Sequence, residues 1–128
     1  WSTLRGHLKR PGVHIQRLED SMATGLPDAN ICYRGHEIWL EGKYLGRLPV
    51  RLTTMVKVGL RAEQATWLED RTLAGGTCMV WVRIEGEGWL LVENDFRLLV
   101  GGVLWEDMLS KWLLFPNAKL MANYILRR

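Results

Sequence analysis

Three charged residues in the first half of the chain could carry out hydrolytic chemistry together. Asp28 follows Pro27, and Glu41 and Lys43 stand two positions apart at the end of an apolar stretch. Two carboxylates at one point repel each other unless they share a cation, and Mg²⁺ or Mn²⁺, which prefer oxygen ligands, are the natural occupants. Such an ion activates water and stabilises charge on a phosphodiester, while a lysine orients the water or offsets the developing charge. The three residues therefore suit metal-assisted hydrolysis of a phosphodiester bond.

Two short strands must bring these residues together. Residues 29–33 and 36–43 have the composition of strands, and the Arg-Gly pair between them is typical of a hairpin turn. A hairpin centred on that pair joins residues whose numbers sum to about 69, which places Asp28 opposite Glu41. Because side chains alternate along a strand, Glu41 and Lys43 share one face. The hairpin therefore predicts that both carboxylates and the lysine converge.

Hydrophobic period and the positions of Gly and Pro predict the remaining elements. Helices are expected over residues 2–10, 61–74, 103–114 and 117–126. Further strands are expected over residues 13–19, 77–84 and 89–93, with loops over 20–28 and 44–60. The helix over 61–74 leaves enough chain for a crossover between parallel strands. We expect a single α/β domain over 1–128, in the order α-β-β-β-α-β, with a mixed central sheet flanked by helices and a helical extension from about residue 103.

One stripe of the helix over 61–74 should face inward. The stripe consists of Leu60, Gln64, Trp67, Leu68 and Arg71. Gln64 is its uncharged polar member, and a polar group on an inner face needs a hydrogen-bond partner.

The net charge of +3 is unevenly distributed along the chain. Residues 1–61 contain ten Lys and Arg against five Asp and Glu, and residues 62–128 contain seven against nine. The segment 43–61 has five cations and no acid: Lys43, Arg47, Arg51, Lys57 and Arg61. Directly after the strand with Glu41, these cations are placed to contact phosphates of DNA, although a solvated loop would have the same composition. Three upstream cations could extend this surface: Arg5, Lys9 and Arg10. Arg17 stands two residues before Glu19 and could either contact the phosphate to be cut or pair with that acid.

Several other classes of protein are disfavoured. A membrane span would need about 18 consecutive apolar residues, and the chain has no such run. Residues 1–5 lack the charged-then-apolar pattern of a secretion signal, so we expect an intracellular, cytoplasmic protein. We expect Cys32 and Cys78 to be free thiols. The histidines show no zinc-binding spacing, and no organic cofactor is expected.

Four stretches follow one another in an order and spacing that characterise a nuclease superfamily. They are Arg17-Leu18-Glu19-Asp20, Gly25-Leu26-Pro27-Asp28, Trp39-Leu40-Glu41-Gly42-Lys43 and Leu60-Arg61-Ala62-Glu63-Gln64-Ala65-Thr66-Trp67-Leu68. Together they resemble the PD-(D/E)XK nucleases. The similarity is greatest to the VRR-type and Holliday-junction-resolvase-like branch, which includes small phage-encoded members. The resemblance covers roughly residues 13–84.

The resemblance implies a restriction-endonuclease-like core that cleaves DNA with Mg²⁺ or Mn²⁺. It implies metal binding by Asp28 and Glu41, a catalytic role for Lys43, and a Gln64 side chain that reaches the same site. Glu19 would be a further acidic ligand. The sequence departs from the family at Gly42, where an apolar residue is usual, and a glycine weakens strand packing. Gly42 points away from the face with the carboxylates.

Alternative functions on this fold stay open at the level of sequence. A nicking, flap-type or sequence-specific endonuclease would have the same residues, and so would a DNA-binding module without catalysis. A homodimer is expected because the C-terminal third supplies more apolar surface than one core needs. The residues concerned are Trp105, Leu109, Trp112, Leu113 and Phe115, although Trp81, Trp105 and Trp112 also have core-like spacing.

Overall fold

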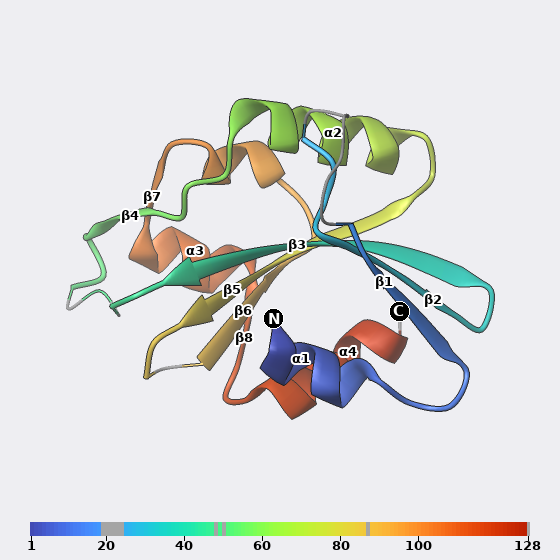
Figure 1. The fold of residues 1–128 in the computed structure, drawn as a ribbon. Coiled ribbons are helices and arrows are strands. Elements are labelled where there is room, and N and C mark those ends of the chain that lie inside the picture. The colour runs from blue at the N-terminus through green and yellow to red at the C-terminus, as the bar shows by residue number, and fades with distance from the viewer. Residues whose placement is uncertain (19–24, 48, 50, 87, 128) are drawn as a thin grey trace.

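The computed structural model describes residues 1–128 except 19–24, 48, 50, 87 and 128. The helices are α1 (Ser2–Leu8), α2 (Ala62–Leu73), α3 (Trp105–Lys111) and α4 (Ala118–Arg127), with a 3-10 turn η1 (Phe96–Leu99). The strands are β1 (Val13–Arg17), β2 (Ala29–Tyr33), β3 (His36–Leu45), β4 (Met55–Lys57), β5 (Thr77–Ile84), β6 (Gly88–Val92), β7 (Gly102–Leu104) and β8 (Leu113–Phe115). A helix begins the described chain, and strands and helices follow it in the order α1-β1-β2-β3-β4-α2-β5-β6-η1-β7-α3-β8-α4 (Figure 1).

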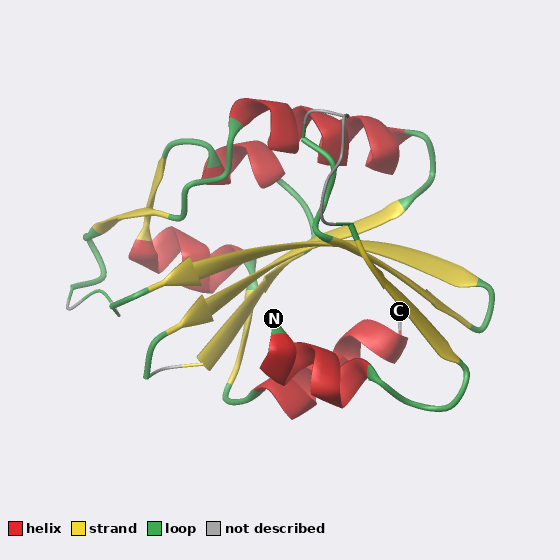
Figure 2. Ribbon diagram, viewed as in Figure 1, coloured by secondary structure: helices red, strands yellow, loops and turns green. Residues whose placement is uncertain are grey.

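The main sheet has the order β1-β2-β3-β5-β6-β8, and β4 pairs with β7 in a separate ribbon. β3 and β5 are parallel and are joined through α2, whereas the other neighbouring pairs in the main sheet are antiparallel. The predicted mixed sheet and the crossover through the helix over 61–74 are therefore confirmed. Figure 2 shows the strands of the main sheet as one twisted layer between helices.

Each face of the sheet has its own hydrophobic core. α2, η1 and α3 cover one face, where Leu68, Phe96 and Trp105 are buried. α1 and α4 cover the other, where Leu4 and Met121 are buried. Figure 1 shows α2 on one side of the sheet, with α1 and α4 on the opposite side. We call these the α2 face and the α1/α4 face.

The predicted helix over 103–114 is confirmed over Trp105–Lys111 and wrong at both ends, because this segment contributes to three elements. The end of β7 precedes α3, and β8 follows it. Helix α3 ends because Trp112 adopts an extended backbone, and its buried indole donates a hydrogen bond to the carbonyl oxygen of Asn94 at 3.2 Å. β8 then gains backbone partners from β6. The C-terminal third therefore completes the sheet and is not a purely helical extension.

The predicted loop over 44–60 also contains regular structure. β3 continues to Leu45, and β4 pairs with β7 through Val56 and Val103. Both valines are buried, and their burial in the α2-face core explains why so short a ribbon forms.

Smaller expectations are mostly confirmed. Trp81, Trp105 and Trp112 are buried, and Cys32 and Cys78 are free. In the inward stripe of α2, Arg71 is an exception: it is exposed, and its guanidinium lies over the rings of Trp39 and Trp67. Among the described residues, no helix combines the length and hydropathy that crossing a membrane requires.

Candidate active site

Asp28 stands at the point where the β2–β3 pairing ends. Ala29 lies opposite Leu40, which confirms the predicted register and brings Asp28 to the level of Glu41. The backbone carbonyl of Asp28 accepts a hydrogen bond from Leu18, and its Oδ2 accepts one from the Gly42 amide at 2.8 Å. The Asp28 side chain thus accepts the Gly42 amide in place of a backbone carbonyl of β2. This hydrogen bond fixes the Asp28 carboxylate beside β3.

Glu41, Lys43 and Gln64 form a hydrogen-bonded cluster on the α2 face. The Gln64 Nε2 donates to Glu41 Oε2 at 3.0 Å, and the Lys43 ammonium donates to Gln64 Oε1 at 3.1 Å. Lys43 also lies 3.4 Å from Glu41 Oε2. In addition, Gln64 Oε1 accepts the backbone amide of Arg61, which caps the first turn of α2. One amide side chain therefore holds the carboxylate, the lysine and the start of the helix together.

The electrostatics of this cluster centre on Glu41. Its side chain is only 3% exposed. Burial raises the pKa of Glu41 to about 7, and the nearby Asp28 carboxylate raises it as well, while Lys43 opposes the shift. A glutamate with a pKa near 7 takes up or releases its proton in response to small changes around it.

The donor set fits a divalent cation that prefers oxygen. Glu41 Oε1 is buried and has no hydrogen-bond partner among the described atoms, although an unpaired buried carboxylate oxygen is costly. A cation held between this oxygen and Asp28 would satisfy it. Mg²⁺ is commonly bound through one or two carboxylates, with water and phosphate filling the other positions. Within the described part of the chain, no group of three or more His, Cys, Asp or Glu residues could hold a metal ion.

Two glycines allow the chain to approach closely around this cluster. Gly25 has a positive φ of 85°, and a Cβ there would lie 2.3 Å from the carbonyl oxygen of Glu63. The segment that leads to Asp28 therefore packs directly on the first turn of α2. A Cβ on Gly42 would lie 2.1 Å from the Trp81 ring. Gly42 leaves the space that this ring fills, so the expected weakening of strand packing is not observed.

A pocket of about 380 Å³ lies beside Asp28 and Lys43. Its lining includes Arg17, whose guanidinium lies 5.4 Å from the centre of the Trp1 ring. Arg83 of β5 also lines it, and the sequence reasoning missed this residue. The available signal was that Arg83 is the charged residue within the apolar stretch that forms β5.

The remaining predicted residues fall into three groups. Arg47, Arg51 and Lys57 line a hollow of about 490 Å³ just beyond the end of β3. Arg10 lies elsewhere: it lines a pocket with Arg34 and His36 at the opposite end of β3. Its guanidinium donates to Asn123 of α4.

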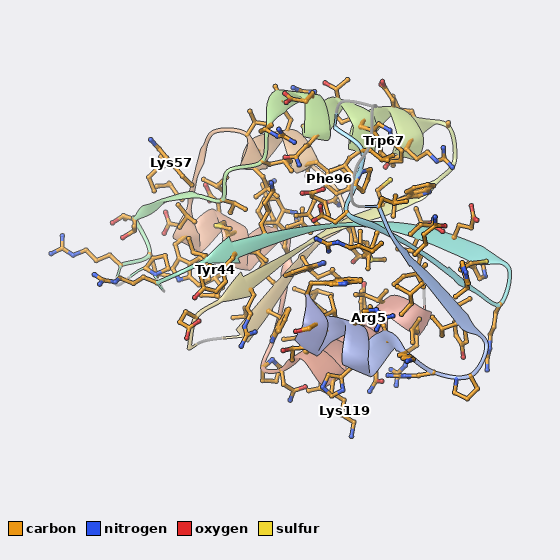
Figure 3. All side chains as sticks on the ribbon, in the orientation of Figure 1. Arg5, Tyr44, Lys57, Trp67, Phe96 and Lys119 are labelled. Carbon is orange, nitrogen blue, oxygen red and sulfur yellow. The ribbon has the colours of Figure 1, made fainter. Side chains whose placement is uncertain are left out.

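Arg5 belongs to α1 and Lys9 directly follows it, on the α1/α4 face (Figure 3 labels Arg5). Trp1, directly before α1, lines the pocket beside Asp28, whereas Arg10 lies at the other end of β3. Glu19 lies outside the described residues.

Comparison with known proteins identifies the fold of the chain. No protein-family profile matches the sequence, and no curated protein matches it significantly. Among solved structures, the chain is similar to Hjc, a Holliday junction resolvase from the archaeal hyperthermophile Archaeoglobus fulgidus. The TM-score is 0.55 and the sequence identity is 15%, over 88% of each chain. The chain therefore has the restriction-endonuclease-like fold of that resolvase, with a mixed central sheet flanked by helices.

Proposed function

We propose that this protein is a metal-dependent endonuclease that hydrolyses phosphodiester bonds of DNA, with a preference for branched substrates like that of a resolvase. The observation that carries the proposal is the cluster of Asp28, Glu41, Lys43 and Gln64. It lies at the joint of the β2–β3 hairpin and α2. The fold shared with an archaeal resolvase supports the same proposal. The sequence motifs around Asp28, Glu41 and Gln64 favour the VRR-type and Holliday-junction-resolvase-like branch of the superfamily. We propose that the protein works in the cytoplasm, which for a phage-encoded member is the cytoplasm of the host.

Asp28 and Glu41 would hold Mg²⁺ or Mn²⁺, which supplies an activated water and neutralises charge on the phosphate. Lys43 is the cation of the site, and Gln64 fixes its ammonium through the bond to Oε1. A fixed ammonium stabilises charge that develops on the phosphate more effectively than a mobile one, because no reorganisation is needed during the reaction. Glu19 is proposed as a further acidic ligand.

The DNA-binding surface of the proposed enzyme lies on both sides of the cluster. Arg17 lines the pocket that contains Asp28 and Lys43. Arg47, Arg51 and Lys57 line the hollow beyond β3, and Arg61 is exposed at the start of α2. Contacts of this kind hold the phosphate backbone without reading its sequence. Lys9 and Arg10 would contact DNA only if a branch of the substrate reached the α1/α4 face.

A cleavage assay tests the proposal. Wild-type protein is incubated with four-way, flapped, nicked and linear DNA, with Mg²⁺, with Mn²⁺ and with EDTA. We expect cuts only with metal and fastest on branched DNA. Asp28→Asn should lose about a thousandfold in rate and still bind DNA. Glu37→Gln is the matched control, because Glu37 is an exposed carboxylate on the same face of β3.

Each contrary outcome identifies an alternative. Equal cutting of linear and branched DNA would favour a sequence-specific endonuclease, and cuts confined to one strand would favour a nicking or flap-type enzyme. DNA binding without any cleavage by the wild type would favour the non-catalytic module. Asp28→Asn cutting at the wild-type rate would overturn the mechanism.

We propose a homodimer as the working form, because two cuts across a branch point need two sites. The dimer surface expected from the sequence included Trp105 and Trp112, but both are buried in the core. The apolar side chains available for a dimer contact are instead exposed leucines of α3, β8 and α4: Leu109, Leu113, Leu114 and Leu120. β8 is also an edge strand of the main sheet, which leaves one side of it open to pairing. Light scattering at micromolar concentration tests this, and a strict monomer would remove the dimer from the proposal.

A further inference from the structure

The segment between β3 and α2 begins and ends at the candidate active site. At its start, Lys43 lies two residues before the end of β3. At its end, the Arg61 amide donates to the same Gln64 oxygen that accepts the Lys43 ammonium. Any DNA whose phosphate lies at the cluster would therefore also lie near this segment.

The middle of the segment is held firmly by its backbone. The first two amides of α3, those of Trp105 and Glu106, donate to the carbonyl oxygens of Thr54 and Leu52, each at 2.9 Å. These bonds satisfy amides that a helix start leaves unpaired. β4 continues from this anchor and pairs with β7. The turn and β4 thus have a fixed position on the core.

Two large apolar side chains nevertheless point away from the core on this anchored segment. Leu52 is 56% exposed and Met55 is 55% exposed. Val56, the middle residue of β4, is in contrast only 4% exposed. The Met55 side chain lies over Gly102 of β7, where a Cβ would meet its Cγ at 2.4 Å. Single exposed apolar side chains are ordinary. Here both stand on one rigid support, three residues apart in the chain, at a cost in hydration that folding does not recover.

Cations lie around Met55. The hollow of about 490 Å³ is lined by Met55 together with Arg47, Arg51 and Lys57, and among the described residues no acid lines it. Arg51 directly precedes Leu52 in the chain. Figure 3 shows Lys57 and Tyr44, which follows Lys43, at the same end of the molecule. The first turn of α3, whose Glu106 amide donates to the Leu52 carbonyl, carries two acids, Glu106 and Asp107, where negative charge complements the helix N-terminus. Apolar groups flanked by phosphate-binding cations are the composition of a wedge that enters DNA between base steps.

We propose that Leu52 and Met55 form an apolar wedge that inserts between bases next to the phosphate to be cut, while Arg47, Arg51 and Lys57 hold the flanking backbone. The inference rests on the proposed nuclease function and names its substrate class, DNA in which stacking is already interrupted by a branch, nick or mismatch. Unstacking costs least at such positions. The wedge therefore selects the shape of the substrate, and the cluster of Asp28, Glu41, Lys43 and Gln64 cuts it.

The test compares Leu52→Ser/Met55→Ser with wild type on DNA that contains 2-aminopurine beside a nick. Binding is measured in EDTA, so that no cleavage occurs. We expect wild type to raise 2-aminopurine fluorescence, because the base loses its stacking partner, and the double variant to lose most of this rise. In Mg²⁺, the preference of the variant for nicked over intact duplex should fall about tenfold, while its cutting of intact duplex stays near wild type. Leu73→Ser is the matched control, because Leu73 is 86% exposed at the far end of α2.

The outcomes separate the wedge from the nuclease function. If wild type neither binds nor cuts DNA, the proposed function fails and the wedge fails with it. If wild type cuts nicked DNA but the double variant keeps the full fluorescence rise and preference, the wedge alone is overturned. A change in oligomeric state of the double variant in sedimentation would assign the two side chains to a protein interface and also overturn the wedge. Because both side chains are exposed, the variant should keep the thermal stability of wild type, which checks that it is folded.

Discussion

On the α2 face of β3, Glu41 and Lys43 are bound to Gln64 and surrounded by core, whereas on the α1/α4 face Gly42 lies directly beneath the ring of Trp81. One face keeps a buried carboxylate, Glu41, whose Oε1 has no hydrogen-bond partner among the described atoms. The other is filled by apolar side chains. Adjacent residues of one strand thus have opposite energetic roles, because side chains alternate between faces. The apolar face stabilises the sheet, and the polar face contains an arrangement that costs stability and that only a function would require.

The largest expected effect tests the polar face. Lys43→Met removes the ammonium that Gln64 positions, and cleavage of branched DNA should fall about a thousandfold, because the charge that develops on the phosphate loses this fixed cation. Rates are measured at saturating DNA with Mg²⁺, and circular dichroism checks the fold. Lys111→Met is the control, since Lys111 is an exposed lysine of α3 that pairs only loosely with Asp95 at 3.9 Å. A Lys43→Met rate within tenfold of wild type would remove the lysine from the mechanism.

The next effect tests the apolar face. Gly42→Ala would place a methyl group 2.1 Å from the Trp81 ring, and overpacking of this kind costs about 3 kcal/mol in the free energy of unfolding. Gly46→Ala is the control, because a Cβ there would meet only Tyr44, at 3.6 Å. Urea unfolding followed by tryptophan fluorescence measures both. Equal stability of the two variants would mean that the Trp81 ring moves freely and that this face is not rigid.

The stability cost of the polar face should depend on pH. An unfolded Glu41 titrates near its ordinary pKa of 4.5, and burial raises the pKa in the folded protein to about 7. The protonated form is therefore favoured by folding, a contribution that is complete below pH 4.5 and is lost as pH rises through 7. Glu41→Gln stays neutral at every pH. It should match wild type at pH 4 and be more stable at pH 8, by on the order of 2 kcal/mol.

Urea titrations at pH 4, 6 and 8 measure this difference between Glu41→Gln and wild type. Glu37→Gln serves as the exposed control and should show no such trend. A wild type as stable as Glu41→Gln at pH 8 would mean that the buried carboxylate costs nothing and would weaken the contrast between the two faces. Cleavage by Glu41→Gln should be lost at every pH, because a neutral amide does not replace a metal-binding carboxylate.

The smallest expected effect concerns Gln64, the side chain of α2 that is hydrogen-bonded to Glu41 and Lys43 on the polar face of β3. Gln64→Ala removes the acceptor of the Arg61 amide and both bonds to the cluster. Stability should fall by about 1 kcal/mol, typical of a lost helix cap, and the cleavage rate by about tenfold, because Lys43 becomes mobile. Glu63→Gln, in the same turn of α2, is the control and loses only an exposed ion pair. A Gln64→Ala rate equal to wild type would show that Lys43 needs no positioning.

Local pattern was sufficient to predict much of the fold and of the candidate site. The pairing rule of a hairpin predicted that Asp28 would meet Glu41, and the structure has that register. Helical spacing predicted that Gln64 faces inward, and it is 5% exposed. These predictions succeed because they depend on the alternation of strands and the period of helices, which are properties of the backbone.

Prediction failed where a distant part of the chain decided the outcome. Residues 103–114 have an amphipathic helical pattern, yet Trp112 leaves the helix to bond Asn94, and the next residues pair with β6. β4 forms because β7 is beside it. Arg83 went unassigned, and Arg10 lies at the opposite end of β3 from the cations it was expected to join, because both positions depend on which strands and helices become neighbours.

The sequence by itself determined which charged side chains meet at the candidate site, since the hairpin register brings Asp28 to Glu41, and Glu41 and Lys43 share one strand face. Only the tertiary structure decided the environment of those side chains. Packing against α2 excludes water from Glu41, which moves its pKa toward 7, and it provides Gln64 as a partner from another element. Desolvation and long-range hydrogen bonds depend on the whole fold, and no local pattern specifies them.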